Sequence, residues 1–375
     1  MRGENQRIGR RARLTLLAVC LLAVNAHAQY FGQNKVRHKS HDFKVLKTDH
    51  FDIHYYDEKK DAAVEFGRMA ERWYSRLRTV FNHDLSGRQS VVLYASHPDF
   101  RGTTVLPDYI GETTGGVTEG LRRRIVMPLS GSLADTDHVL GHELIHAFQF
   151  DITTRPGPVG GSGTPGALRL PLWFIEGMAE YLSVGAADPH TAMWMRDAVE
   201  REQLPAIGQL DAHKYFPYRW GQAFWAFVAG KYGDDIVGKI LKAAGHAGGA
   251  EPAISSVLQT TIEQLSQDWH RALNEHYTRA LQAATAAEKQ ARAIVRAEKN
   301  AGGLNVSPVL SPDGKMVAFF SERDQYSIDL FLAEAETGRI LGKITETALD
   351  PHFDSLQFMS STGAWSPDGL KFAFG

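Results

Sequence analysis

Apolar and polar residues alternate between residues 43 and 56 (FKVLKTDHFDIHYY), which predicts one or two β-strands. Residues 57–82 follow with apolar side chains at helical spacing, so we expect an amphipathic helix there. Residues 90–94 form a short apolar run that is typical of a strand. Residues 115–129 predict a further strand or hairpin that ends in RIVMP. The first part of the chain is therefore predicted to be rich in strands.

Helical spacing dominates the chain from there to residue 299. We expect helices at residues 135–150, 172–184, 191–203, 218–232, 235–244 and about 261–299. Between the first two lies RPGPVGGSGTPG (155–166), whose five glycines and three prolines predict a surface loop. Strands followed by helices are typical of an α+β domain, with an antiparallel or mixed sheet preceding the helices.

Alternation returns after a break at residues 300–303 (NAGG). An SPDG turn at 311–314 opens a series of short strands, and SPDG recurs at 366–369, fifty-five residues later. This internal repeat is typical of β-propeller blades, and it resembles the Tol-type propeller repeat. Residues 304–375 would hold one blade and the start of a second, whereas a propeller closes with at least about four blades. We therefore expect that the chain is a fragment of a longer protein, or that its tail packs only loosely on the preceding domain.

The first 28 residues have the layout of a secretory signal peptide. Five arginines lie among the first thirteen residues, an eleven-residue apolar run follows at 14–24, and Ala26-His27-Ala28 supplies small residues for cleavage. The apolar run is shorter than the roughly 18 residues of a membrane span. We therefore expect export, to the periplasm or the medium, after cleavage near Ala28, with residues 29–299 as the first folded domain. An uncleaved anchor and a lipoprotein attached through Cys20 are the alternatives.

Composition and charge narrow the function classes. The 375 residues include 41 Lys and Arg against 43 Asp and Glu, and 43% are hydrophobic. Neither wholesale disorder nor a basic surface for nucleic acid is therefore expected. Cleavage after Ala28 would leave 36 basic and 42 acidic residues, a net charge of −6. The single cysteine, Cys20, lies in the predicted signal peptide, which excludes a disulfide framework and a Cys-ligated metal site. No later stretch has the apolar length of a stable membrane span.

The clearest chemical signal is HELIH at residues 142–146. Residues four apart on a helix share a face, so the imidazoles of His142 and His146 can bind one ion. Glu143 lies about 100° round the helix, which suits a base that acts on a metal-bound water. The opposite face is apolar and would bury the helix in the core: Leu140, Leu144, Ala147 and Phe148.

Two carboxylates lie four residues apart in the apolar helix predicted at 172–184. Like charges at this spacing destabilise a helix by roughly 0.2–0.5 kcal/mol. A cation would remove that cost if Glu176 bound it and Glu180 accepted a hydrogen bond from the far nitrogen of a ligating histidine. A surface acidic pair is the alternative. Two histidines and one glutamate leave a fourth position for water, as in catalytic zinc sites.

HExxH followed by WxxEGxAEY is similar to the two active-site helices of the gluzincin metallopeptidases, specifically the peptidase MA-like group. The resemblance covers roughly residues 43–285 in element order. It implies that His142, His146 and Glu176 ligate one Zn²⁺ per chain and that Glu143 is the general base. It also implies that the carboxylate of Glu180 contacts a metal-ligating histidine without binding the metal itself. The GxMEN exopeptidase signature is missing, and GVTEG at 116–120 is the nearest stretch.

The resemblance also implies a tyrosine or histidine that stabilises the oxyanion. Tyr218, at the start of the helix predicted at 218–232, is our candidate, and His213 is the second.

We therefore expect an exported zinc peptidase, in which Glu143 activates a zinc-bound water that attacks a peptide bond. Its substrate would be a peptide or protein, and the propeller would recruit substrates or a protein partner. One alternative is a non-catalytic envelope scaffold that combines a peptidase-like domain with a propeller. That alternative predicts loss of the base, yet Glu143 and all three ligands are present. A metal-dependent hydrolase of a non-peptide substrate is the other alternative.

Overall fold

The computed structural model describes residues 40–56, 59–107, 110–111, 113–154, 163–283, 291–296, 302, 304–324, 327–347, 349, 356 and 362–375. The predicted signal peptide and residues 155–162 of the predicted loop lie outside this set. The chain divides into two compact units, of which the smaller comprises Met1–Ser40 and Gly102–Tyr109. The larger unit contains every helix and strand given below.

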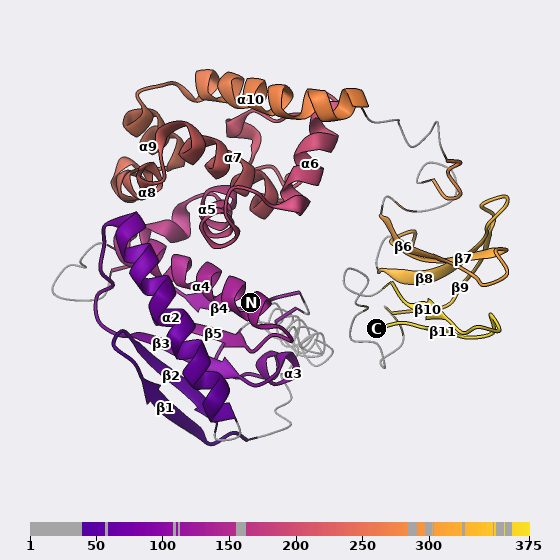
Figure 1. The fold of residues 1–375 in the computed structure, drawn as a ribbon, viewed down its shortest axis with the longest axis horizontal. Coiled ribbons are helices and arrows are strands. Elements are labelled where there is room, and N and C mark those ends of the chain that lie inside the picture. Colours follow the sequence, from indigo (N-terminus) through magenta and orange to yellow (C-terminus); the bar gives the residue numbers. More distant parts are fainter. Residues whose placement is uncertain are drawn as a thin grey trace, which may run out of the picture. The chain divides into compact units, whose positions relative to one another are not determined.

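A five-stranded mixed sheet forms the first part of the larger unit (Figure 1). Its strands run in the order β1 (Phe43–Lys47), β2 (Phe51–Tyr56), β3 (Gln89–Tyr94), β5 (Arg124–Pro128) and β4 (Val117–Glu119). The three central strands pair in parallel, and β1 and β4 pair antiparallel at the edges. The register places Ile53, Val91 and Ile125 side by side, and all three are fully buried. The strands predicted in this region are confirmed.

Nine α-helices lie in the part of the chain that the structure describes. They are α2 (Lys60–Phe81), α3 (His97–Arg101), α4 (Leu133–Thr153), α5 (Leu172–Val184), α6 (Pro189–Glu200), α7 (Pro217–Tyr232), α8 (Asp235–Ala247), α9 (Ala250–Leu258) and α10 (Ile262–Ala283). Helix α2 connects the parallel strands β2 and β3 and packs against β2 and α4. Helix α4 contacts β4 and β5 on one side and α5 on another, so it lies between the sheet and the later helices.

The helix face predicted to be buried in α4 is confirmed. Leu140, Leu144 and Phe148 are fully inaccessible and join the main hydrophobic core with residues of α2 and the sheet. The helix begins at a serine cap, because the Ser132 side chain accepts a hydrogen bond of 3.0 Å from the Asp135 amide. This anchoring leaves the other face of α4, which carries His142 and His146, directed toward α5.

Helices α5 and α7 approach each other through glycines. A Cβ placed on Gly177 would lie 2.2 Å from the Cα of Gly221, and one placed on Gly221 would lie 2.0 Å from the carbonyl oxygen of Trp173. Side chains larger than hydrogen are therefore excluded at both positions, and the two backbones touch. The contact brings the start of α7 beside the part of α5 that carries Glu176.

Sequence reasoning missed the short helices α3 and α9, and it was wrong about the end of α10. The predicted helix at 261–299 does not include residues 291–296, which are not helical. There Ile294 and Val295 pack against the C-terminal sheet, and Arg292 donates a 3.0 Å hydrogen bond to the carbonyl of Ala335. These tertiary contacts outweigh the helix propensity of an Ala-rich segment.

The C-terminal strands form a four-stranded antiparallel sheet and a hairpin. The sheet runs in the order β6 (Asn305–Leu310), β7 (Met316–Ser321), β8 (Asp329–Glu334) and β9 (Ile340–Lys343). The hairpin joins β10 (Ala364–Trp365) to β11 (Phe372–Ala373). The predicted short strands are thus present, whereas the described residues contain no closed propeller. A propeller stays a prediction.

The two SPDG turns form the same hydrogen bonds. Ser311 donates to the carboxylate of Asp313 at 2.7 Å and accepts from the Met316 amide at 2.9 Å. Ser366 donates to Asp368 at 2.6 Å and accepts from the Lys371 amide at 2.9 Å. The sequence repeat is therefore also a repeat of local structure.

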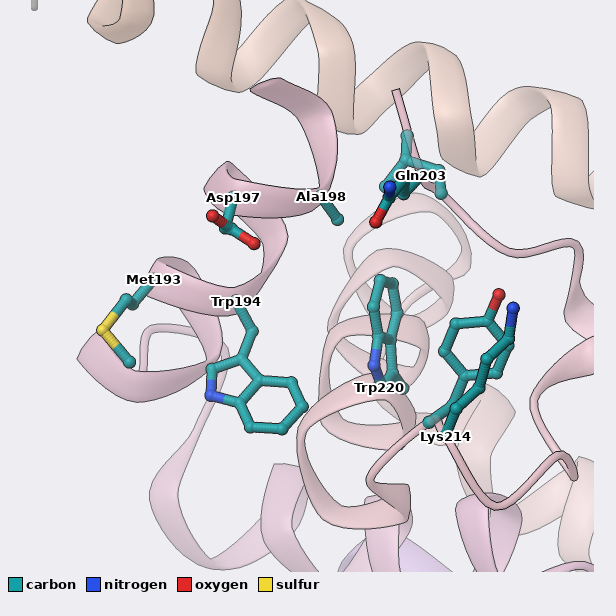
Figure 2. Close-up of a pocket in the computed structure, with 9 residues that line it drawn as sticks. Met193, Trp194, Asp197, Ala198, Gln203, Lys214 and Trp220 are labelled. Atoms are coloured by element: carbon teal, nitrogen blue, oxygen red, sulfur yellow. The ribbon is translucent and has the colours of Figure 1, made fainter. Parts of the chain in front are cut away.

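Helices α6 and α7 and the segment between them line a cavity of about 810 Å³ (Figure 2).

None of the described helices combines the length and the apolar character needed to cross a membrane.

Candidate metal centre

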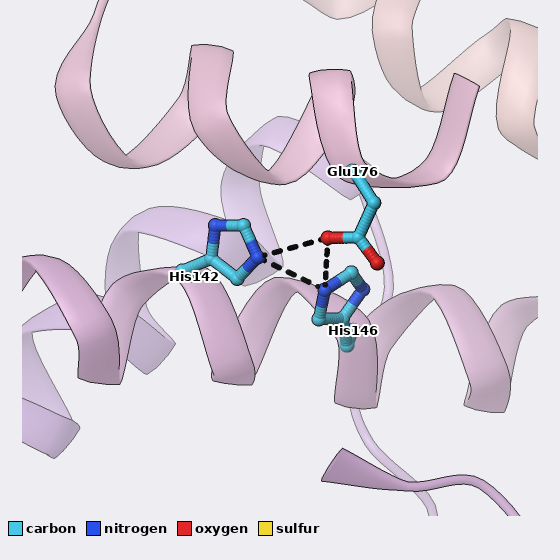
Figure 3. A group of neighbouring side chains, drawn as sticks. All are labelled: His142, His146 and Glu176. Atoms are coloured by element: carbon cyan, nitrogen blue, oxygen red, sulfur yellow. Dashed lines mark hydrogen bonds and ion pairs between the residues drawn. The ribbon is translucent and has the colours of Figure 1, made fainter. Parts of the chain in front are cut away.

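Three ligand-type side chains meet where α4 faces α5 (Figure 3). The Nε2 atom of His142 lies 3.1 Å from Oε2 of Glu176 and 3.1 Å from Nε2 of His146, and the remaining separation is 3.2 Å. In a tetrahedral zinc site, with bonds of about 2.0–2.1 Å, the ligand atoms are about 3.3 Å apart. The structure thus brings the three predicted ligands together at a spacing that suits one ion, although their α4 and α5 positions lie thirty or more residues apart.

The side chains of this cluster shift one another's protonation. Burial disfavours the charged form of the His146 ring, but the Glu176 carboxylate outweighs that effect and raises the pKa of His146 to about 9. Burial likewise opposes ionisation of Glu176, yet the two histidines lower the pKa of its carboxyl well below the usual range. A positive charge is therefore favoured among these atoms near neutral pH.

Gln149 fixes the orientation of the His146 ring. Its side-chain nitrogen donates to the carbonyl of Ile175 at 2.9 Å, so its oxygen faces the His146 Nδ1 atom at 2.8 Å. Because that oxygen can only accept, the proton lies on Nδ1, and Nε2 of the neutral ring presents a lone pair to an ion. Sequence reasoning missed Gln149. Its position three residues after His146, on the same helix, is the only local signal.

The edge strand β4 positions Glu143. Oγ1 of Thr118 lies 2.6 Å from Oε2 of Glu143 and 2.9 Å from its backbone oxygen, within donating distance of both. The preceding Gly116 packs against the same side chain, where a Cβ would lie 2.8 Å from Cγ of Glu143. The GVTEG stretch, noted in the sequence only for its missing asparagine, therefore holds the predicted base.

Tyr218 lies beside the cluster. Its ring stacks on His142, with centroids 5.8 Å apart and planes 17° apart, and it lines a cavity of about 430 Å³ together with His142 and Glu143. Burial, reinforced by the negative charge of Glu176, raises the pKa of Tyr218 above its usual range, so the phenol keeps its proton. The second oxyanion candidate, His213, is exposed and does not line this cavity.

The carboxylate of Glu180 is buried near the cluster, but its partners differ from those predicted. Within the described residues, neither His142 nor His146 forms a hydrogen bond with it. Instead Oε2 lies 3.5 Å from Nε2 of His138, and Oε1 lies 3.7 Å from the guanidinium of Arg219. His138, one turn before His142 on α4, is the imidazole that reaches this carboxylate. The spacing of 138, 142 and 146 could have indicated it.

We compared the chain with models of known protein families and with curated proteins, and neither comparison gave a match.

Proposed function

We propose that this chain is a zinc-dependent peptidase whose active site comprises His142, His146, Glu176, Glu143 and Tyr218. The observation that carries the proposal is the convergence of two imidazole nitrogens and one carboxylate oxygen within 3.2 Å of one another, beside a cavity lined by Glu143 and Tyr218. Two histidines, one carboxylate and no thiolate form the ligand set of catalytic zinc rather than structural zinc.

When bound, zinc supplies Lewis acidity, which lowers the pKa of water and polarises a carbonyl group. The carboxylate of Glu143 accepts the proton of the attacking water and later delivers it to the leaving amine. Thr118 holds that carboxylate in place through the 2.6 Å contact. Tyr218, whose phenol keeps its proton, donates a hydrogen bond to the oxyanion that develops on the substrate.

The sequence pattern extends the proposal beyond the site. The predicted signal peptide supports export after cleavage near Ala28, and the resemblance to gluzincins supports peptides or proteins as substrates. The C-terminal repeat would bind substrates or a protein partner.

Metal analysis of purified protein tests the ligand assignment. We expect about one zinc per chain in the wild type, and loss of that zinc in His142→Ala and in Glu176→Ala. The matched control is His50→Ala, because His50 pairs with Glu71 at 2.7 Å in another part of the domain and is not a proposed ligand. Equal zinc content in the wild type and in both ligand variants would overturn the assignment.

The Glu143→Gln variant separates metal binding from catalysis. It should keep the zinc and lose at least about a thousandfold in peptide-cleavage rate, because the ligands remain while the base is removed. Turnover close to that of the wild type would show that another residue is the base or that the activity comes from a contaminant.

A further inference from the structure

The cavity between α6 and α7 is lined by aromatic side chains that the proposed chemistry does not use. Figure 2 shows Trp194 of α6 and Trp220 of α7 extending into the same space, with Gln203 and Lys214 at its edges. Its volume of about 810 Å³ lies within the range of about 300–1,000 Å³ that is usual for ligand sites.

Part of this aromatic lining is exposed. Trp194, which lines the cavity, is 37% accessible. The ring of Phe216, which lines the separate cavity at the candidate metal centre, lies only 5.9 Å from that of Trp194 and is 44% accessible. Trp220, deeper in the cavity, is 5% accessible. Single exposed apolar residues are common on protein surfaces, but a contiguous patch of exposed aromatic side chains is typical of a ligand-binding or protein-binding surface.

Phe216 links this cavity to the candidate metal centre. Phe216 lines the 430 Å³ cavity at the candidate metal centre, together with His142 and Glu143. Its ring lies 5.1 Å from the ring of Tyr218, which in turn lies 5.8 Å from the ring of His142. Together with the 5.9 Å step to Trp194, these separations set an upper limit of about 17 Å between the Trp194 and His142 rings. An extended peptide covers that distance with about five residues.

The edge of the cavity also carries an unneutralised positive charge. Among the described residues no carboxylate pairs with Lys214, whose ammonium lies 4.8 Å from the centre of the Tyr215 ring. The acidic residue of the same cavity, Asp197, is paired with Arg201 at 2.9 Å. The charge balance therefore favours an occupant with an anionic group next to its apolar part.

We propose that this cavity is a distal substrate pocket, which binds a bulky apolar side chain next to an acidic residue of the peptide cleaved at the metal centre. This inference rests on the proposed peptidase function. The bound side chain lies up to about five residues from the cleaved bond, so only substrates of sufficient length reach the pocket. Binding there adds affinity through burial of apolar surface and contact with Lys214.

Substrate length provides the test. Cleavage sites are first mapped in β-casein, an unfolded protein substrate, and one site is then made as a twenty-residue peptide and as a capped tetrapeptide. We expect Trp194→Ala to lower kcat/KM about tenfold for the long peptide, mainly through KM, and to change tetrapeptide cleavage less than twofold. Lys214→Gln should lower kcat/KM for the long peptide by a smaller factor that disappears at high salt.

Further measurements separate an effect on the pocket from a general effect on the fold. Leu341→Ala, at a residue of β9 that is 42% accessible, is the matched control and should leave cleavage of both peptides unchanged. Zinc content and Tm of Trp194→Ala should equal those of the wild type. An alanine scan of the long peptide should find one apolar residue whose replacement lowers kcat/KM of the wild type about tenfold. The same replacement should leave kcat/KM of Trp194→Ala unchanged.

Equal losses for long and short peptides, or no loss for either, would overturn the distal pocket while leaving the peptidase proposal intact. If the zinc-loaded wild type cleaves neither β-casein nor the peptides, the proposed function itself fails. The pocket is then tested by the binding of fluorescein-labelled β-casein. A Kd that is unchanged by Trp194→Ala would overturn it, and a Kd raised about tenfold would support it.

Discussion

At the scale of single residues, the proton held among His142, His146 and Glu176 has a measurable consequence. The pKa of His146 is about 9 in the metal-free fold, against about 6.5 for an unperturbed histidine, so this group stabilises the fold fully below about pH 6.5. That contribution is lost as the pH rises through 9. The pKa of Glu176 is lowered, so its contribution is present above about pH 4.5 and is lost as the pH falls. Together, His146 and Glu176 stabilise the folded, metal-free protein against unfolding most between about pH 4.5 and 6.5.

We predict that the stabilisation by zinc grows with pH. Zinc must displace the proton on His146, and this displacement becomes easier as the pH approaches 9. The difference in Tm between zinc-loaded and EDTA-treated protein should therefore increase from pH 6 to pH 8.5, whereas the Tm of the EDTA-treated form should fall over part of that range. Thermal unfolding at constant ionic strength measures both. A Tm difference that stays constant or shrinks would contradict the assigned proton.

The sequence predicted which side chains would come together where the pattern is local, and their roles as metal ligands stay a prediction. The spacing of His142 and His146 places both rings on one helix face, and the acidic Glu176 stands out in an apolar helix. Gln149 and Thr118 could not be predicted in the same way. Gln149 is oriented by a carbonyl 26 residues away, and Thr118 contacts a carboxylate 25 residues away, so both contacts depend on how the elements pack.

At the scale of helices and strands, the glycine contact between α5 and α7 controls the geometry of the site. Gly221 lies one turn after Tyr218 on α7, and a Cβ there would meet the Trp173 carbonyl oxygen of α5 at 2.0 Å. Gly221→Ala must push the helices apart. We expect a loss of about 1–3 kcal/mol in the free energy of unfolding and a fall of at least about tenfold in peptide cleavage, because Tyr218 moves away from Glu176.

Gly230→Ala on the same helix is the control for this prediction. A Cβ at Gly230 meets no atom within 4 Å, so this variant should gain about 0.5–1 kcal/mol through helix propensity and keep its activity. Urea unfolding and peptide cleavage of the two variants, measured side by side, provide the comparison. Equal behaviour of Gly221→Ala and Gly230→Ala would show that the helix contact does not set the site geometry.

Helices and strands were predicted best where their periodicity is long and regular. The pattern of α2 and the apolar run of β3 led to the observed elements within a few residues. The end of α10 was wrong, because composition alone could not show that Ile294 and Val295 pack against a sheet formed later in the chain. The mixed pairing of the five strands also depends on contacts between distant segments that no local pattern encodes.

At the scale of the whole molecule, the described residues form separate hydrophobic cores. The main core draws its members from the sheet β1–β5 and the helices up to α10, with Leu46 and Tyr277 as its outermost contributors in sequence. The C-terminal sheet has one core on each face, and the one that includes Phe319 and Phe331 also recruits Ile294 and Val295. Among the described residues, none belongs to both the main core and a C-terminal core.

We predict that residues 41–283 fold without the C-terminal strands. This truncated chain retains every member of the main core and all three candidate ligands, so its Tm should lie within about 5 °C of the main transition of the full chain. It should also bind about one zinc and cleave short peptides at the rate of the full chain. Thermal unfolding, metal analysis and peptide cleavage check these three points. An unfolded or zinc-free truncated chain would refute the independence of the cores.

The backbone contact between Gly177 and Gly221 also determines when the proposed active site becomes ordered. Side chains that separate two helices can exchange conformers, but touching backbones have no rotamers to exchange. The separation between the helices that carry Glu176 and Tyr218 is therefore fixed once the chain has folded. The entropy of aligning these two groups is lost during folding, so under the proposed function the binding of substrate does not have to supply it.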